Sequence, residues 1–473
     1  MADPQTIAAR TAGRAGAGAA ELTPAAARLT VLAACLGWLF SAVDIVLLML
    51  FQRPVAEALG SEPQAIRIAI GVGLLGSAAG GIAFAQLGDR YGRVRALGWC
   101  VLLYSLATAG MGLARNVHEL MAWRFAAGIG TGAEWSIGFA LITEVQRKAG
   151  RGRVGGLVAG MFNLGTFVAI ALFQSPLGWR WSFGAMALPA LLVLWLRLRV
   201  PESPLWLAWQ QARARGELDA RLQAQSRLAP LALLLRGRLR ALTLKATLLF
   251  VLMNFAFYAF STVFINYLQD DSARGGLGLD AQAQFPFQLA LNLGALASVV
   301  AAGALSDRIG RHAAFALFCG IGGAGSAWLY VVTQGGAGST AQLLAAFTIV
   351  VVGYGVNGVV GTLLAELFPT HVRAAGAGLA QNLGKGIGGM AGPPLVGALA
   401  ASAGYPLALA LPGAVVLALA ALIWLLPRVG GRELRAVEDE RYLDAQRGRR
   451  GGALSSRKAR VRAPRRARGI RPS

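Results

Sequence analysis

A charged turn of one pattern occurs twice in the chain, each time between two long apolar runs. The first copy lies within 83–97 and reads A-F-A-Q-L-G-D-R-Y-G-R-V-R-A-L, and the second lies within 303–311 and reads G-A-L-S-D-R-I-G-R. A turn with this many charges cannot lie in hydrocarbon, so each copy is predicted to face water between two membrane spans. Its return in the second half indicates that the chain contains two copies of one unit.

The composition agrees with a chain that lies mostly in a membrane. Of its 473 residues, 56% are hydrophobic and only 14% are charged, whereas soluble domains average about 25% charged residues. A membrane-spanning helix needs roughly 20 apolar residues. We therefore predict an all-α membrane protein with twelve transmembrane helices, arranged as six plus six. The predicted spans are 29–51, 67–87, 95–114, 119–145, 154–173, 181–199, 243–268, 285–305, 312–333, 341–365, 375–398 and 405–426.

These spans divide the chain into five parts. The sequence predicts a disordered tail over 1–28, a six-helix bundle over 29–199, a basic connector over 200–242, a second six-helix bundle over 243–426 and a basic tail over 427–473. The loops after spans 2, 4, 8 and 10 hold ten Lys or Arg residues, against five in the opposite loops. Basic loops face the cytoplasm, so both termini are expected to be cytoplasmic, with the spans in the cytoplasmic (inner) membrane.

The net charge of +23 is concentrated at the C-terminal end, where residues 428–473 carry 15 Lys or Arg against 5 acids. Beside a membrane, such a tail is expected to contact anionic headgroups rather than nucleic acid. Cys35, Cys100 and Cys319 all lie in apolar runs, so no disulfide framework or metal spacing is present. No Ser/His/Asp set, metal cluster or phosphate loop is apparent. We therefore expect no enzyme activity and no cofactor.

Four ionisable residues are predicted to lie well inside the spans, where charge is costly and usually functional: Asp44, Arg124, Glu134 and Lys385. Asp44 and Arg124 are expected at one depth, because their helices run in opposite directions at about 1.5 Å per residue. They could therefore pair, and Asp44 and Glu134 are candidate proton-coupling groups together with Arg124. The alternative is a structural ion pair for the first two, and a hydrogen bond between helices for Glu134.

Lys385 lies in a glycine-rich segment followed by Pro393-Pro394, so its helix is predicted to be bent or broken. The lysine could contact an anionic substrate or could extend to the inner surface. With Arg124 and Lys385 set against Asp44 and Glu134, the charges in the spans balance, and protonation of Asp44 would leave one positive charge for an anion. Further candidate substrate-binding residues are Gln381, Asn163, Asn254, Asn292 and Asn357, with Asn266 as another polar position.

The two charged turns resemble the loop motif of the major facilitator superfamily. R-F-A-A-G-I-G at 124–130 is similar to its helix 4 motif, and P-E-S-P at 201–204 resembles the signature that ends the first half of sugar and metabolite porters. E-L-F-P-T-H-V-R at 366–373 resembles the equivalent segment of the second half. Ala85 stands where the motif usually has glycine, which predicts a looser contact between helices 2 and 11.

The resemblance implies two bundles that rock about a central site, and a lock that joins them on the cytoplasmic side. The implied lock residues are Asp89, Arg90, Gly92, Arg93, Asp307, Arg308 and Arg311. G-A-E-W at 132–135 is similar to the G-G-E-W segment of sialate- and lactate-type proton symporters. G-W-L-F at 37–40 with Asp44 resembles their helix 1, although Ser41 replaces the first of two aspartates.

The function favoured by these features is proton-coupled symport of a small organic anion, such as a monocarboxylate or a sialate, by a monomer. Two alternatives stay open at this point: a porter for neutral sugars or polyols, and a proton-coupled antiporter that exports drugs or metabolites.

Overall fold

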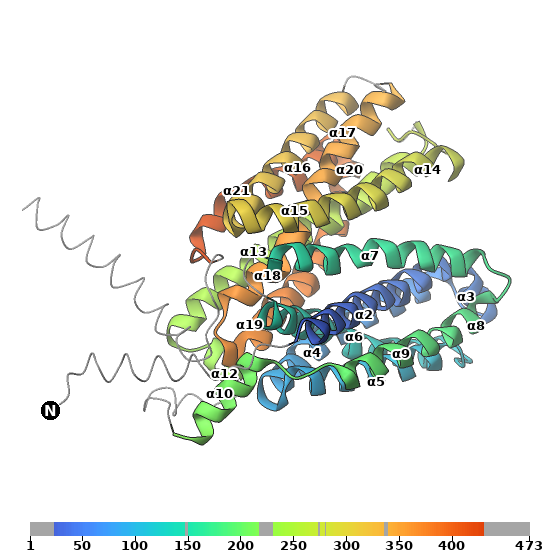
Figure 1. Ribbon diagram of the computed structural model, residues 1–473. Coiled ribbons are helices and arrows are strands. Elements are labelled where there is room, and N and C mark those ends of the chain that lie inside the picture. Colours follow the sequence, from blue (N-terminus) through green and yellow to red (C-terminus); the bar gives the residue numbers. More distant parts are fainter. Residues whose placement is uncertain are drawn as a thin grey trace, which may run out of the picture.

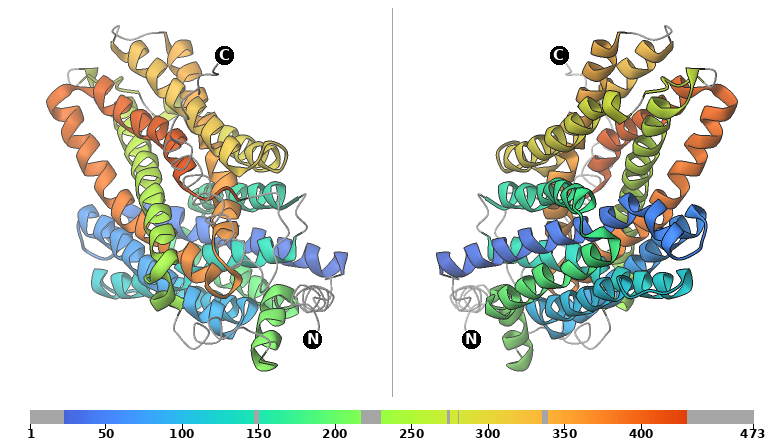
Figure 2. Two further views of the ribbon diagram at one scale, coloured as in Figure 1. Left: turned by 90° about the vertical axis from the view of Figure 1, so that its left-hand side faces the viewer. Right: turned by 90° about the vertical axis from the view of Figure 1, so that its right-hand side faces the viewer.

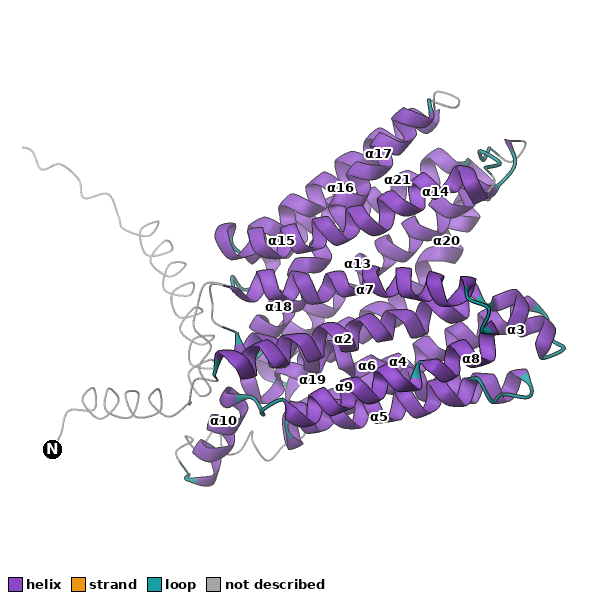
Figure 3. Ribbon diagram, turned by 45° about the vertical axis from the view of Figure 1, so that its right-hand side comes forward, coloured by secondary structure: helices purple, strands orange, loops and turns teal. Residues whose placement is uncertain are grey.

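The computed structural model describes residues 23–146, 150–216, 230–272, 275–279, 281–334 and 339–429 (Figure 1). Residues 1–22 and 430–473 lie outside this part of the chain, so most of the predicted tails 1–28 and 427–473, and the contact with anionic headgroups, fall outside the described residues. The predicted N-terminal tail is too long, because residues 24–28 already belong to the first helix. Within the described ranges the secondary structure is helical, without a strand (Figure 3).

The first half consists of long helices connected by short turns. Its helices are α2 (Pro24–Leu50), α3 (Gln52–Ala58), α4 (Pro63–Tyr91), α5 (Arg93–Met111), α6 (Val117–Val145), α7 (Arg151–Gln174), α8 (Gly178–Ala185) and α9 (Ala187–Arg199). Two short helices follow, α10 (Pro204–Ala214) and α12 (Pro230–Leu234). They lie at one end of the molecule, which we call the connector side (Figure 1).

Interruptions in the helices are more frequent in the second half. Its segments are α13 (Gly237–Gln269), α14 (Ala281–Leu289), η3 (Ala290–Gly294), α15 (Ala295–Ile309), α16 (Arg311–Gln334), α17 (Thr340–Gly353), η4 (Tyr354–Val356), α18 (Asn357–Leu367), η5 (Thr370–Val372), α19 (Arg373–Leu383), η6 (Gly384–Gly388), α20 (Gly389–Ala403), α21 (Tyr405–Leu422) and η7 (Ile423–Leu425). The helices of the two halves contact each other directly, and α7 of the first half lies beside α15 of the second (Figure 2).

Ten of the described helical segments are long and apolar enough to cross a membrane. The other two predicted spans are interrupted helices, α8 with α9 and α19 with α20. The prediction of an all-α membrane protein with twelve helices in two six-helix bundles is therefore confirmed. At the connector side α4 contacts α19, and α18 contacts α7. Away from that side, α14 and α17 lie apart from α3 and α8 (Figures 1 and 3).

The helix that holds Lys385 changes to a π-helix in its glycine-rich segment, where the sequence predicts a bend or a break. The segment Gly384–Gly388 forms a π-helix, and Lys385 lies in it. The segment packs closely on α13: a Cβ added to Gly388 would lie 2.0 Å from the carbonyl oxygen of Val251. A second π-helix, Ala290–Gly294, holds Asn292. Because π-turns inside α-helices occur frequently at functional sites, both π-helical segments mark positions of interest.

Both charged turns place a glycine where the backbone reverses. Gly92, between α4 and α5, has φ 111°, and Gly310, between α15 and α16, has φ 90°. A side chain is strained at such angles, so glycine is favoured there. The prediction that these turns face water is right for the exposed Arg90, but it is wrong for Asp89 and Arg93, which are 4% and 0% exposed. These two side chains are buried in contacts between the bundles.

Candidate functional site

Asp44 and Arg124 form an ion pair inside the first bundle. Arg124 Nη1 on α6 donates to Asp44 Oδ2 on α2 at 2.8 Å, and Thr108 Oγ1 on α5 donates to Asp44 Oδ1 at 3.1 Å. Asp44 is 2% exposed and Arg124 is 4% exposed. A buried carboxylate and guanidinium offset each other's desolvation only while they remain together. Protonation of Asp44 would therefore leave Arg124 as an uncompensated cation.

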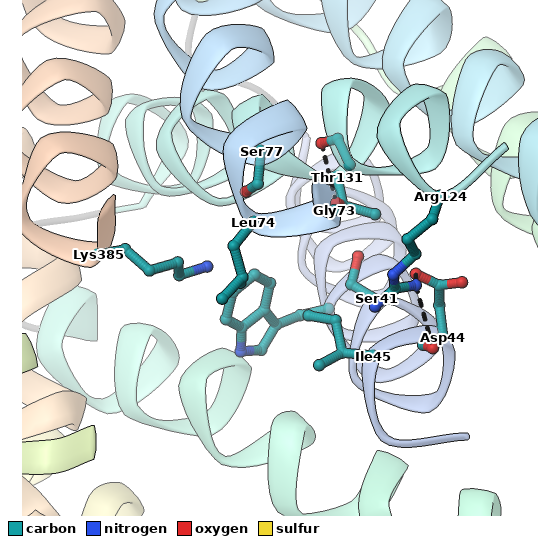
Figure 4. Close-up of a pocket in the computed structure, with 11 residues that line it drawn as sticks. Ser41, Asp44, Ile45, Gly73, Leu74, Ser77, Arg124, Thr131 and Lys385 are labelled. Carbon is teal, nitrogen blue, oxygen red and sulfur yellow. Dashed lines mark hydrogen bonds and ion pairs between the residues drawn. The ribbon is translucent and has the colours of Figure 1, made fainter. Parts of the chain in front are cut away.

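Lys385 reaches the same place from the second bundle. One small pocket, the central pocket, is lined by Trp38, Ser41, Asp44, Ile45, Gly73, Leu74, Ser77, Arg124, Gly128, Thr131 and Lys385. It has about 20 Å³ for water-sized groups, roughly the space that one water molecule needs. Figure 4 shows Lys385 extending toward Leu74 from the opposite side to Asp44 and Arg124. The arrangement brings two cations and one carboxylate around one pocket formed by both bundles.

A second buried ion pair corrects the predicted charge balance. Glu134 on α6 accepts a hydrogen bond from Ser41 Oγ at 2.6 Å, and Arg197 Nη2 on α9 lies 3.6 Å from Glu134 Oε1. Arg197 is 1% exposed, although it is absent from the predicted set of intramembrane charges. It lies near the end of a predicted span, where basic residues usually reach water. With Arg197 included, both carboxylates have a cation, and Lys385 is the excess charge.

Lys385 makes no hydrogen bond or ion pair with any described residue. Asp44 is held by Arg124, and Glu134 is held by Arg197. Lys385 is half-buried in the contact between the bundles. An ammonium group in such a place gains from any anion that can approach it, because water is scarce there. The central pocket is therefore chemically suited to bind a carboxylate.

The remaining predicted substrate residues do not line the central pocket. These are Gln381, Asn163, Asn254, Asn266, Asn292 and Asn357. The amide of Asn254 donates to a carbonyl group of its own helix at 2.9 Å, and that of Asn357 donates to a carbonyl group of the adjoining η4 at 3.0 Å. Gln381 Oε1 is buried without a hydrogen-bond partner among the described residues. The structure thus brings together Asp44, Arg124 and Lys385 from the predicted set, with Glu134 one contact away through Ser41.

On the connector side, each motif aspartate binds the start of a helix in the other bundle. Asp89 accepts hydrogen bonds from the backbone N–H groups of Ala374 and Ala375, at 3.2 Å and 2.7 Å, at the start of α19. Asp307 accepts from those of Gly152 and Arg153, at 2.8 Å and 2.9 Å, at the start of α7. Helix N-termini carry unpaired N–H groups and partial positive charge, so a carboxylate is stabilised there.

Two glutamates complete these contacts. Glu144 Oε1 lies 3.1 Å from Arg93 Nη2 in its own bundle and 2.5 Å from Arg373 Nη1 in the other. In the second half Glu366 Oε1 lies 3.1 Å from Arg311 Nη2 and 3.8 Å from Arg151 Nη1 of the first bundle. All six side chains are buried. We call the contacts of Asp89, Asp307, Glu144 and Glu366 across the bundles the connector-side lock.

The two glutamates are absent from the predicted lock, although the internal repeat carried a signal for them. Glu144 follows Arg93 by 51 residues, and Glu366 follows Arg311 by 55. The distance in sequence from the motif arginine to the glutamate is nearly the same in the two halves, and this repeated spacing could have identified both glutamates. The predicted lock residues Arg90 and Arg308 are exposed and have no role in these contacts.

The contact between α4 and α19 is close, contrary to the expectation that Ala85 loosens it. Ala85 is fully buried, and a Cβ added to Gly378 would lie only 2.9 Å from the Cβ of Ala85. The missing side chain at Gly378 provides the space that glycine would have provided at position 85.

Comparison with known proteins settles the family. The family model described as Major Facilitator Superfamily matches residues 30–393 and 292–465. The chain belongs to this superfamily. It is therefore an integral membrane transporter rather than an enzyme, and transporters of this superfamily bind small-molecule substrates. The fold described above, with twelve helices in two bundles, is the arrangement that the resemblance of the motifs implied.

Relatives in this superfamily include metabolite transporters. The chain is 28% identical over 388 residues to the niacin transporter NiaP of Acinetobacter baylyi, covering 76% of this chain and 84% of that protein. It is 26% identical over 376 residues to the sialic acid transporter NanX of Escherichia coli, covering 78% and 86%. The proton:xylose symporter XylE of E. coli has a similar fold, with a TM-score of 0.71, 21% identity and coverage of 88% and 99%.

The lock predicts a strong effect of Asp89→Asn. The amide is uncharged and presents an NH₂ group to the α19 N–H groups, so a charge-assisted contact worth roughly 1.5–3 kcal/mol is lost. The connector side should then open more often. A cysteine at Thr362, which is buried against Gly155 of the other bundle, should react with a maleimide roughly 10- to 100-fold faster in a background where the three native cysteines are alanine.

Arg90→Gln is the matched control, since it removes an exposed charge from the same turn. This variant should label at the wild-type rate. If a correctly folded Asp89→Asn protein is labelled at the wild-type rate, Asp89 stabilises only the turn between α4 and α5 and not the closed arrangement of the bundles.

His371 lies between the spans on the connector side and stacks on Trp209 of α10, with ring centroids 4.9 Å apart. Burial, together with Arg373 and Arg93, lowers the pKa of His371 to about 4 from its ordinary value of 6.5. The closed arrangement therefore holds neutral His371. As the pH falls from about 6.5 to about 4, an arrangement that exposes the imidazole to water binds a proton that the closed arrangement does not bind. The closed arrangement is therefore destabilised relative to the open one, by up to roughly 3 kcal/mol.

The His371 imidazole should accordingly favour an open connector side in acid, and its contribution is the difference between the wild type and a variant without the imidazole. Spin labels at the exposed positions Arg90 and Arg308, one in each bundle, report the distance between the bundles. His371→Asn keeps a neutral polar side chain, so at pH 4 it should show a smaller fraction of longer distances than the wild type, whereas the two proteins should agree at pH 7.5. Equal fractions of longer distances in the two proteins at pH 4 would show that His371 makes no such contribution.

Proposed function

We propose that the chain is a proton-coupled symporter for a small organic anion with a carboxylate group, working by alternating access. The observation that carries the proposal is Lys385, which has no counter-charge among the described residues and shares a pocket with the Asp44–Arg124 pair. The names of two relatives support it, since niacin and sialic acid are both carboxylic acids.

Charge provides the coupling between proton and anion. With Asp44 ionised, Lys385 is the one cation in excess over the buried carboxylates of the two pairs. A proton on Asp44 frees Arg124 and adds a second cation to the pocket, so an anion binds more tightly to the protonated protein. By thermodynamic linkage, the bound anion then raises the affinity for the proton by the same factor. Symport requires that the proton and the substrate anion bind together in this way.

The closed connector side supports an orientation and a cycle. We propose that this side faces the cytoplasm, with both termini there and the protein in the cytoplasmic membrane as a monomer. The structure then corresponds to a state whose cytoplasmic side is locked. Once proton and anion are bound, the bundles rock, the lock opens and the substrate leaves inward. The narrow central pocket has to widen for any organic substrate to enter.

Uptake by proteoliposomes tests the proposal. With an inward proton gradient, wild-type protein should accumulate at least one of lactate, nicotinate and N-acetylneuraminate, and a protonophore should abolish the accumulation. Xylose and a cationic dye serve as the competing classes. Accumulation of xylose alone would favour a sugar porter, and proton-driven export of the dye would favour an antiporter.

A further inference from the structure

The Glu134–Arg197 pair lies nearer the connector side than Asp44 and has no part in the cycle above. Glu134 follows Arg124 by ten residues on α6, which places it about 15 Å further along the helix axis. Arg197 lies in the last turn of α9, immediately before the connector. A carboxylate in this position is separated from the central pocket but lies on the way from that pocket to the connector side.

A second pocket, the inner pocket, contains this pair. Glu134 and Arg197 line it together with Trp135. Trp135 packs edge-on against Phe250 of α13, with ring centroids 6.5 Å apart, so the inner pocket adjoins the second bundle. Trp38 lines both the inner and the central pocket, so the two pockets adjoin at this side chain. The two buried ion pairs thus belong to two adjoining pockets.

Hydrogen bonding within the pair is incomplete. The three guanidinium nitrogens of Arg197, Glu134 Oε1 and the buried Tyr104 hydroxyl have no hydrogen-bond partner among the described residues. Arg197 and Glu134 are 1% and 3% exposed. Native structures satisfy nearly all buried polar groups, and exceptions usually mark ordered water or a functional role. Gly37 leaves space here, because a Cβ at that position would lie 2.0 Å from Glu134 Oε1.

Ser41 connects the two pockets. Its side chain lines the central pocket, and its hydroxyl donates to Glu134 Oε2 at 2.6 Å. Ser41 precedes Asp44 by three residues on α2, so both side chains lie on one face of the helix, as Figure 4 shows. Asp44 and Ser41 both line the central pocket, whose space of about 20 Å³ is enough for one water molecule.

We propose that Glu134 is a second proton site, which receives the proton from Asp44 through Ser41 and releases it into the inner pocket. Protonated Asp44 gives its proton to a water molecule in the central pocket, and that water gives one to Ser41 Oγ. Ser41 gives its own hydroxyl proton to Glu134 Oε2. Asp44 becomes a carboxylate again, Glu134 becomes a carboxylic acid, and Ser41 and the water are unchanged. The inference rests on the proposed function, because it takes Asp44 as the first proton acceptor.

Arg197 holds the charge of Glu134 before the proton arrives and after it leaves. It is a positioning residue, since it touches neither the central pocket nor Ser41 in the described contacts. Its incomplete hydrogen bonding allows Glu134 to change protonation state without breaking a full set of bonds. A purely structural pair would instead be expected to satisfy its donors.

Proton transfer from Asp44 to Glu134 can be tested without substrate. Proteoliposomes are adsorbed on a sensor that records the charge moved within the protein after a jump in pH. Wild-type protein should displace charge. Ser41→Ala keeps both carboxylates but removes the relay hydroxyl, so the displacement should slow by about tenfold or more, as expected when a group that transfers protons is removed. Ser41→Thr keeps the hydroxyl and should restore the rate. Ser105→Ala is the matched control, because Ser105 is a buried serine of the same bundle that bonds only to its own helix.

The double variant Glu134→Gln/Arg197→Gln removes the pair without leaving an unpaired buried charge, and it should lower the total charge displaced. If Ser41→Ala displaces charge at the wild-type rate while Asp44→Asn displaces none, the relay is overturned and the proposed function stays intact. Full displacement in Asp44→Asn would overturn both, because the proton would then enter elsewhere.

Discussion

Replacing Asp44 by asparagine is expected to abolish proton-driven accumulation of the substrate while substrate exchange across the membrane continues. The amide cannot take up a proton, so the charge beside Arg124 stays the same throughout the transport cycle. The equilibrium between the outward-facing and the inward-facing arrangement of the bundles then no longer responds to pH through this site. Uptake in proteoliposomes with an inward proton gradient should stop at the external concentration. Exchange of labelled for unlabelled substrate, which needs no net proton movement, should remain measurable.

Asp44→Glu is the matched control, since it retains a carboxyl group beside Arg124 and Thr108. It should keep a measurable part of the accumulation. Accumulation by Asp44→Asn to the wild-type level would show that the proton binds at another residue, and Asp44 would then be a structural partner of Arg124.

Lys385→Gln is expected to weaken the binding of the carboxylate substrate. Loss of a buried charge partner typically costs 2–5 kcal/mol, so the apparent Kd or KM should rise by roughly 30-fold to several thousand-fold, and by less where water enters. The proton site is untouched, so the residual transport should still respond to the proton gradient. Affinity is measured by concentration-dependent uptake or by competition with a tightly binding carboxylate.

Lys385→Arg retains the positive charge in the π-helix and should lose much less affinity than Lys385→Gln. Equal affinity in the wild type and Lys385→Gln would place Lys385 outside the substrate site. The charge argument would then depend on Arg124 alone.

The features that could be predicted from the sequence are those set by local chemistry. Apolar runs of sufficient length predict the helices, because backbone groups in hydrocarbon must bond within their own segment. Glycines around Lys385 predicted an irregularity in its helix, and the structure has a π-helix there. Counting residues from the helix ends predicted that Asp44 and Arg124 lie at one depth, where the structure has their ion pair.

The features that could not be predicted depend on packing between distant segments. Arg197 lies near a span end, where an arginine usually reaches water, but α2 and α6 cover it. Asp89 and Arg93 have the charged composition of an exposed turn, and η5 and the start of α19 in the other bundle contact them. Ala85 departs from the motif, yet a glycine 293 positions later, Gly378, restores the close contact.

Proton movement that accompanies the substrate is the most direct test of anion–proton symport. Wild-type proteoliposomes are placed in weakly buffered medium without an imposed proton gradient. A carboxylate that the uptake assay has identified as a substrate is then added, and an electrode records the pH of the external medium. We expect the medium to become more alkaline on addition of the carboxylate, no change with xylose, and no change with Asp44→Asn. Entry of the carboxylate without alkalinisation, or alkalinisation of equal size with Asp44→Asn, would contradict proton coupling at this site.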